Sequence, residues 1–156
     1  MVVAENQENL ISRSRRTRIA VIQSLFLKAF YKDENLSNEE TLKQIKAYYQ
    51  DHFKMAFESY LDHSLIDNIL LYCQQNEARL EQEITDLMQG KPSFNRLSMI
   101  LQKILLSGAS EIALRTDLDL AIILNEYVEI TKAFEDVKSA RFVNGLLQSF
   151  ANLKRN

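Results

Sequence analysis

Residues 93–114 read SFNRLSMILQKILLSGASEIAL, the most apolar stretch of the chain. Its large apolar residues recur at spacings of three and four, the repeat of one helix face. They are Leu97, Ile100, Leu101, Ile104 and Leu105. The pattern predicts a central helix that is buried in the core. Gly108 lies inside this stretch, and its missing side chain allows a neighbouring backbone to approach closely.

Apolar stripes with the same repeat lie on both sides of the central stretch. They predict further helices over about residues 12–30, 38–59, 62–90, 120–134 and 138–153. The third of these is either one long helix or two helices broken near Gln75. Strand-like alternation of apolar and polar residues is absent from the sequence. The stripes therefore predict an all-α protein.

Residues with capping chemistry stand at the predicted helix ends. Ser37 is followed three positions later by Glu40, which is the spacing of a capping box. The other expected start and stop residues are Ser12 or Ser14, Gly90 with Pro92, Asp117 or Asp119, and Asp136 or Ser139.

The composition supports long helices in one domain. The chain has 156 residues, with only three glycines and one proline, and sheets joined by tight turns need more of both. We expect a bundle of six or seven helices over residues 12–156. Residues 1–11 are polar and lack a helical period, so we expect a flexible N-terminal arm there.

Charge and cysteine content restrict the class of protein. The formal net charge is −2, which argues against non-specific coating of nucleic acid but not against a local basic patch. The single cysteine, Cys73, permits no disulfide within the chain and fits a reducing compartment. The N-terminus does not read as a signal peptide, and no apolar run is long enough to span a bilayer. We expect a cytoplasmic protein.

The sequence shows no arrangement typical of a catalytic, metal or cofactor site. His52 and His63 are eleven positions apart with no cysteine partner. Cys73 lies on an apolar helix stripe, where a buried inert thiol is expected. A phosphate-binding glycine loop and a GxSxG turn are both missing. We therefore expect a protein that is not an enzyme and needs no metal or cofactor.

A cluster of four arginines stands at the start of the first predicted helix: Arg13, Arg15, Arg16 and Arg18. Cations near a helix N-terminus oppose the helix dipole, by about a few tenths of a kcal/mol each. Four together suggest a bound polyanion, because the planar guanidinium suits phosphate and guanine edges. The alternative is a solvated first turn.

A second segment, ILNEYVEITKAFEDVKSARFVNGLL over residues 123–147, combines cations with aromatic rings. Lys132, Lys138 and Arg141 stand around Phe134 and Phe142. Single-stranded RNA binds such surfaces through phosphates on the cations and bases on the rings. The alternative is that both rings belong to the core. Asn144 and Gly145 are expected to serve helix packing or capping.

Three stretches of this sequence resemble the NusB transcription antitermination family. LNEYVEITKAF (124–134), followed by SARFVNGLL (139–147), resembles the C-terminal signature of that family. RRTRIAVIQSLF (15–26) resembles its opening, and SGASEIALRTDLDLAIILNE (107–126) resembles its A-x-x-E-L-x-x-R-x-D stretch. The likeness covers most of residues 13–150.

The resemblance implies an all-helical fold of two packed subdomains without catalysis. It implies binding of boxA-type RNA in ribosomal leader transcripts, together with NusE, a small-subunit ribosomal protein. The complex helps RNA polymerase pass terminators. By the resemblance, Arg15, Arg16 and Arg18 fall on the arginine-rich RNA-binding start of the first helix, called the arginine start below. The C-terminal RNA-binding motif covers Lys132, Phe134, Arg141 and Phe142. Phe26 and Phe30 lie where the first helix of the family reaches toward NusE.

The chain departs from the family pattern at several positions. Glu135 stands where the family has a glycine, Asp119 where it has a proline, and Leu106 where it has an arginine. Around residues 95–101 the family often presents acids to NusE, whereas this chain has Asn95 and Leu101. Leu101 is therefore the third candidate partner contact.

The favoured hypothesis is an RNA-binding antitermination adaptor in which both basic segments form one surface. One alternative is a protein–protein interaction module, or a homodimer that buries the same face and binds RNA weakly. Another is the RNA-binding part of a ribosomal RNA cytosine methyltransferase, to which this fold is also fused. Residues 1–156 leave no room for a cofactor-binding domain, so that alternative requires a longer chain.

Overall fold

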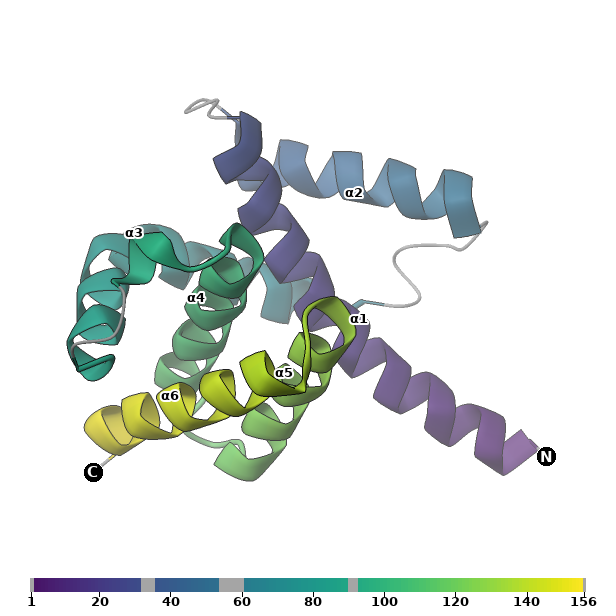
Figure 1. Ribbon diagram of the computed structural model, residues 1–156. Helices are drawn as coiled ribbons and strands as arrows, with labels where there is room; N and C mark the ends of the chain where they lie inside the picture. Colours follow the sequence, from purple (N-terminus) through teal and green to yellow (C-terminus); the bar gives the residue numbers. More distant parts are fainter. Residues whose placement is uncertain (1, 32–35, 54–60, 90–92, 156) are drawn as a thin grey trace. The chain divides into compact units, whose positions relative to one another are not determined.

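The computed structural model describes residues 2–31, 36–53, 61–89 and 93–155. Every regular element within these ranges is helical (Figure 1). The elements are α1 (Val2–Tyr31), α2 (Asn38–Phe53), α3 (His63–Leu87), the 3₁₀ turn η2 (Phe94–Arg96), α4 (Met99–Leu114), α5 (Leu120–Phe134) and α6 (Val137–Arg155). The predicted all-α class is confirmed. Among the described helices, none is long and apolar enough to cross a bilayer.

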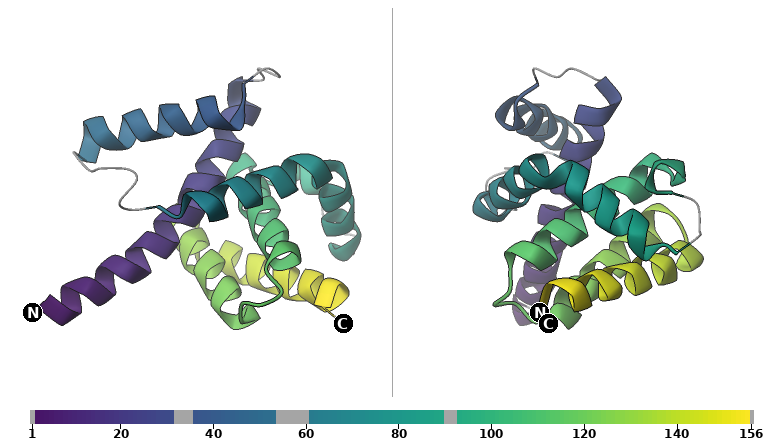
Figure 2. Two further views of the ribbon diagram at one scale, coloured as in Figure 1. Left: turned by 180° about the vertical axis from the view of Figure 1, so that it is seen from behind. Right: turned by 90° about the vertical axis from the view of Figure 1, so that its left-hand side faces the viewer.

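The chain divides into two compact units, an N-terminal unit of residues 1–70 and a C-terminal unit of residues 71–156. In the N-terminal unit, α2 lies against the C-terminal half of α1 (Figures 1 and 2). Apolar residues from α1, α2 and the start of α3 bury one another there: Ala20, Val21, Ile45, Leu61, Ile66, Ile69 and Leu70.

The first helix begins earlier than the sequence indicated. α1 starts at Val2, so neither Ser12 nor Ser14 caps it. Residues 2–11 include good helix formers such as Ala4, Glu5 and Leu10, which extend the helix without an apolar stripe. The segment expected to be an arm is thus helical in conformation, and its flexibility stays a prediction.

The predicted capping box begins α2. The Glu40 amide donates to Ser37 Oγ at 3.1 Å, and the Ser37 amide donates to Glu40 Oε2 at 3.4 Å. α2 ends at Phe53, and residues 54–59 of its predicted extent lie outside the described residues.

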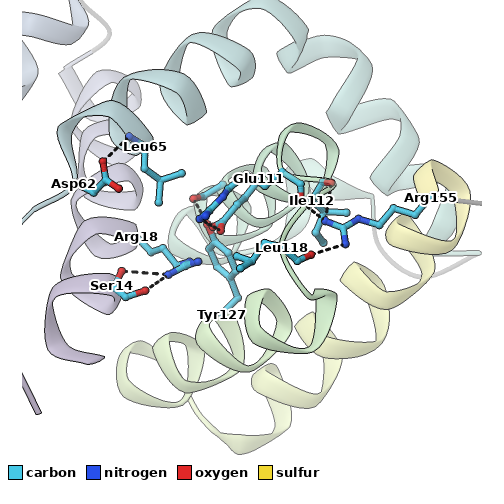
Figure 3. Close-up of polar contacts among 11 residues, drawn as sticks. Ser14, Arg18, Asp62, Leu65, Glu111, Ile112, Leu118, Tyr127 and Arg155 are labelled. Atoms are coloured by element: carbon cyan, nitrogen blue, oxygen red, sulfur yellow. Dashed lines mark hydrogen bonds and ion pairs between the residues drawn. The ribbon is translucent and has the colours of Figure 1, made fainter. Parts of the chain in front are cut away.

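The third helix, α3, is one unbroken helix with no interruption near Gln75. Its first turn is capped by Asp62, whose Oδ1 accepts from the Leu65 amide at 3.1 Å (Figure 3). At its other end α3 stops at Leu87, while the predicted stop residues Gly90 and Pro92 lie outside the described residues.

In the C-terminal unit, α4 is the central buried helix that its sequence predicted. α5 and α6 pack on each other, and both pack on α4 (Figure 2). The run from Lys103 to Ile112 contains only buried residues, and Lys103 itself is 6% exposed. Leu106, which stands where the family has an arginine, is fully buried in this run. An apolar side chain at that position therefore suits its surroundings.

Gly108 of α4 faces the side chains of Leu147 on α6 and Tyr127 on α5. A Cβ placed on Gly108 would lie 2.7 Å from Leu147 Cδ1 and 3.5 Å from Tyr127 Cγ. Leu147 is itself buried, so it has little room to move away. Side chains, and not the neighbouring backbone that the sequence predicted, therefore occupy the space beside this glycine.

This contact predicts that Gly108→Val lowers the free energy of unfolding by about 2 kcal/mol, because added methyl groups overpack the core. Urea denaturation measures the change. Gly145→Val is the matched control, since a Cβ on Gly145 meets nothing within 4 Å. We expect the control to shift stability by less than about 0.5 kcal/mol. Equal effects of the two substitutions would contradict the packing argument.

A buried polar network joins α4 to α5 around Tyr127. The Tyr127 hydroxyl donates to Glu111 Oε1 at 3.0 Å and lies 2.8 Å from Ser107 Oγ (Figure 3). Arg115 Nη1 lies 3.4 Å from Glu111 Oε2. These contacts stabilise a carboxylate that would otherwise be costly to bury.

Arg155 of α6 binds backbone carbonyls at and just after the C-terminal end of α4. Its guanidinium donates to the carbonyls of Leu118 at 3.1 Å, Ile112 at 3.3 Å and Arg115 at 2.6 Å (Figure 3). The last carbonyls of a helix have no partner within the helix, so Arg155 satisfies such groups from α6.

The predicted caps of α5 and α6 are acidic side chains. Asp119 accepts from the Ala121 amide at 3.0 Å, and Asp136 accepts from the Ser139 amide at 2.6 Å. Asp119 thus begins α5 at the position where the family has a proline. Aspartate and proline both favour the start of a helix, so the departure at Asp119 keeps a helix-starting residue at this position.

Cys73 is fully buried, as its place on an apolar stripe predicted. Burial raises the pKa of its thiol from 9.0 to about 11, and the negative charge of Glu77 adds to the effect. The unfolded chain therefore loses this proton at a lower pH than the folded chain does.

The raised pKa predicts that stability falls as pH rises from about 9 to about 11, by on the order of 2 kcal/mol. Below this window the thiol is protonated in both states, and it contributes no pH dependence. Urea denaturation at several pH values measures the fall. The variant Cys73→Ala lacks the thiol and should lose less stability over the same range. An identical fall in the variant would contradict the assignment.

Candidate nucleic-acid interface

The four arginines of α1 differ in their exposure. Arg13 is exposed, and Arg15 and Arg16 are half-buried. Arg18 is only 1% exposed, and its guanidinium donates to the Ser14 carbonyl at 3.3 Å and to the Ser14 hydroxyl (Figure 3). Arg18 is therefore the least accessible of the four arginines, and its role in RNA binding stays a prediction. The reason for its burial is its position on the same helix face as the buried Ile22, four residues later.

The three candidate partner contacts also differ in their exposure. The rings of Phe26 and Phe30 stack with their centroids 6.2 Å apart, and Phe30 is 63% exposed. Leu101 is only 8% exposed, and it lies in the first turn of the buried helix α4. Leu101 is therefore buried with the core, and its partner role stays a prediction that its low exposure does not support. Phe26 and Phe30 remain candidates.

The connection between α5 and α6 presents the second basic segment. Lys132, Lys138 and Arg141 are exposed, and Phe134 is 45% exposed at the last position of α5. Phe142 is half-buried. Lys132 forms an ion pair with Glu129 at 3.2 Å, in which both side chains reach solvent. Such exposed pairs are weak, so Lys132 can exchange its partner.

Glu135 caps α5 without requiring a glycine. Its φ is −124°, outside the left-handed region that favours glycine, and its amide donates to the Thr131 carbonyl at 2.8 Å. Its carboxylate accepts from the Ser98 hydroxyl at 3.2 Å. At the next residue, hydrogen bonds from Ser139 lower the pKa of Asp136. The departure at Glu135 therefore adds negative charge to this connection at a position whose φ is negative.

A groove of about 520 Å³ runs between α5 and α6 on the surface of the C-terminal unit. Leu124 and Val128 of α5 and Ala140 of α6 contribute apolar lining. Lys132 and Arg141 contribute positive charge, and none of the nine lining residues is acidic. Two of the predicted RNA-binding residues are thus brought together on one groove.

Two polar residues of the groove, Asn125 and Asn144, were not predicted from the sequence as binding residues. Asn144 was expected to serve packing or capping, but it is exposed on the groove, and Gly145 beside it is exposed as well. Asn125 could have been found from the sequence. Its spacing from Ala121, Val128 and Lys132 places these four residues on one face of α5.

Residues 15–152 match the model of the NusB family. The chain belongs to the NusB family. Its relatives include the transcription antitermination protein NusB of Caulobacter vibrioides, which is 32% identical over 52% of this chain and 54% of its own length. NusB of Lactococcus lactis subsp. lactis is 37% identical over 55% of this chain and 42% of its own. The chain thus spans about half the length of the curated relatives it matches.

Solved structures share the fold. NusB of T. maritima is 27% identical, with a TM-score of 0.70 over 88% of this chain and 89% of that protein. The antitermination factors NusB and NusE in complex with dsRNA match with a TM-score of 0.67 at 16% identity, over 90% of this chain and 97% of the matched chain. The predicted family is confirmed. Antitermination factors of this family are not enzymes, in agreement with the expectation from sequence.

Proposed function

We propose that this protein is a transcription antitermination factor that binds boxA-type RNA of ribosomal leader transcripts together with NusE. The bound complex would help RNA polymerase pass terminators in the cytoplasm. The observation that carries the proposal is the surface of α5 and α6, where Lys132 and Arg141 line one groove and Lys138 and the ring of Phe134 are exposed. Family membership supports the same function.

The chemistry of this surface suits single-stranded RNA. Lys132, Lys138 and Arg141 are exposed cations that can meet phosphates, and Phe134 offers a ring on which an unpaired base can stack. Base stacking on an aromatic ring contributes about 1–3 kcal/mol per base. A chain with a net charge of −2 therefore has a local site for a polyanion.

The arginine start of α1 is the second part of the proposed RNA surface. Arg13, Arg15 and Arg16 each expose part of their side chain. We propose that these arginines contact the phosphate backbone of the same RNA. Shortening the RNA to half its length tests this point, because a short RNA that reaches only one segment loses the gain in affinity from two linked contacts.

The first experiment is binding of a fluorescent boxA-containing leader RNA, with and without NusE, over a series of salt concentrations. We expect sequence-dependent binding that NusE strengthens. We also expect affinity to fall by orders of magnitude between low and physiological salt if several phosphates are contacted. A scrambled RNA of equal length is the control. Weak binding that is indifferent to sequence and to NusE would contradict the proposed function.

A second candidate function is a protein–protein interaction module, or a homodimer with weak RNA binding. The stacked pair of Phe26 and Phe30 favours it, because Phe30 exposes a large apolar ring. Sedimentation of the purified chain, alone and with NusE, tests it. A dimer that Phe30→Ser converts to a monomer would support this candidate, and a monomer at all concentrations would count against the homodimer.

A further inference from the structure

The groove between α5 and α6 contains polar groups that the fold does not use. Within the described part of the chain, the side chains of Asn125, Asn144 and Arg141 have no hydrogen-bond or ion-pair partner. Two carboxamides supply both donors and acceptors, and the guanidinium supplies donors and a positive charge. All three line one groove from two different helices.

The rest of the groove is largely apolar. Leu124, Val128 and Ala140 line it, and Val137 adds an apolar side chain that is 52% exposed. The volume of about 520 Å³ lies within the range of about 300–1,000 Å³ that is usual for small-molecule sites. The groove therefore offers apolar contact, two amides and positive charge in a space suited to a small anion with an apolar part.

We propose that this groove binds one unstacked nucleotide of the RNA, with its base between α5 and α6. One face of the base would contact Leu124 and Val128 of α5 and the other Ala140 of α6, its polar edge would meet Asn125 and Asn144, and its phosphate would meet Arg141. The inference rests on the proposed function, since it takes RNA as the ligand, and it adds base recognition to a surface so far assigned only phosphate contacts and stacking.

The chemistry favours a nucleotide over an apolar side chain of a partner protein. A leucine or phenylalanine side chain would fill the apolar lining but leave the two amides and the guanidinium without new partners. A nucleotide uses all three kinds of group at once, because a base has two apolar faces and a polar edge and carries a phosphate. The absence of acidic residues among the nine lining residues also suits a negatively charged ligand.

The test combines changes in the protein with changes in the RNA. Asn144→Ala removes one amide, and Ala121→Phe fills the groove with a ring. The matched controls are Gln148→Ala on α6 and Ile122→Phe on α5, both at exposed positions that do not line the groove. The probe is the leader RNA with a single abasic site moved through each position in turn.

We expect Asn144→Ala and Ala121→Phe each to weaken binding about tenfold, as is typical of losing one base contact. The controls should change affinity by less than about twofold. At one RNA position, the abasic site should also weaken binding about tenfold, and should cause no further loss in the Asn144→Ala variant. Thermal unfolding checks that all four variants fold.

The outcomes separate this inference from the proposed function. If the parent protein binds the leader RNA but no abasic position couples to the groove variants, the groove holds no base and only this inference fails. If the parent protein does not bind the leader RNA at all, the proposed function fails and the inference fails with it. If abasic sites couple instead to Phe134→Ala alone, the base lies on that ring and not in the groove.

Discussion

Replacing Arg13 and Arg15 by glutamate should weaken binding of the leader RNA about a hundredfold. Hydrogen bonds to charged groups contribute about 1.5–3 kcal/mol each, and about 1.4 kcal/mol is a factor of ten in affinity. The slope of log affinity against log salt should also flatten, by about 0.7 for each lost phosphate contact. Fluorescence anisotropy over a salt series measures both quantities.

The design of this variant follows from the exposure of the arginines. Arg16 is left unchanged because its Nη1 is buried, and Arg18 because its whole side chain is buried. The matched control is Lys43→Glu with Arg79→Glu, which changes the net charge equally at exposed positions on α2 and α3. Equal losses in the two variants would mean that net charge alone governs binding. Parental affinity in the first variant would exclude the arginine start from the RNA surface.

Substitutions of Phe134 and Phe150 in the C-terminal unit should differ in their effects on stability and on RNA binding. Phe150 is fully buried, so Phe150→Ala should lower the free energy of unfolding by about 3–5 kcal/mol. Phe134 is 45% exposed, so Phe134→Ala should lower it by less than about 1 kcal/mol. Urea denaturation measures both.

The same Phe134→Ala variant should weaken RNA binding by about tenfold, because one stacked base is lost. Phe134→Tyr keeps a ring and should restore most of the affinity. A Phe134→Ala variant that unfolds like Phe150→Ala would place this ring in the core of the protein. A stable variant with full RNA affinity would instead remove Phe134 from the proposed interface.

The helices were predictable because their signal is local. The spacing of Leu97, Leu101 and Ile104 marks one apolar face, and the capping box of Ser37 and Glu40 fixes the start of α2. The start of α1 was missed because residues 2–11 form helix through propensity, without an apolar stripe to mark it. Local patterns thus predict the elements better than their ends.

The candidate site was predicted less completely because it depends on which helix faces meet. Leu101 belongs to the very stripe that predicted a buried α4, and only the family resemblance suggested a partner role for it. Arg18 shares a helix face with Ile22, so its burial was readable in the same way. Asn125 and Asn144 lie on different helices, and only the packing of α5 on α6 brings them to one groove.

The buried thiol of Cys73 can serve as a natural probe of internal motions of the protein. It is the single cysteine of the chain, so a thiol reagent added to the native protein has one place to react and no access to it until the structure opens. The labelling rate then measures how often the surroundings of this residue open, with no engineered probe. Comparing that rate with and without RNA would tell whether a ligand on the surface slows motions around this buried residue.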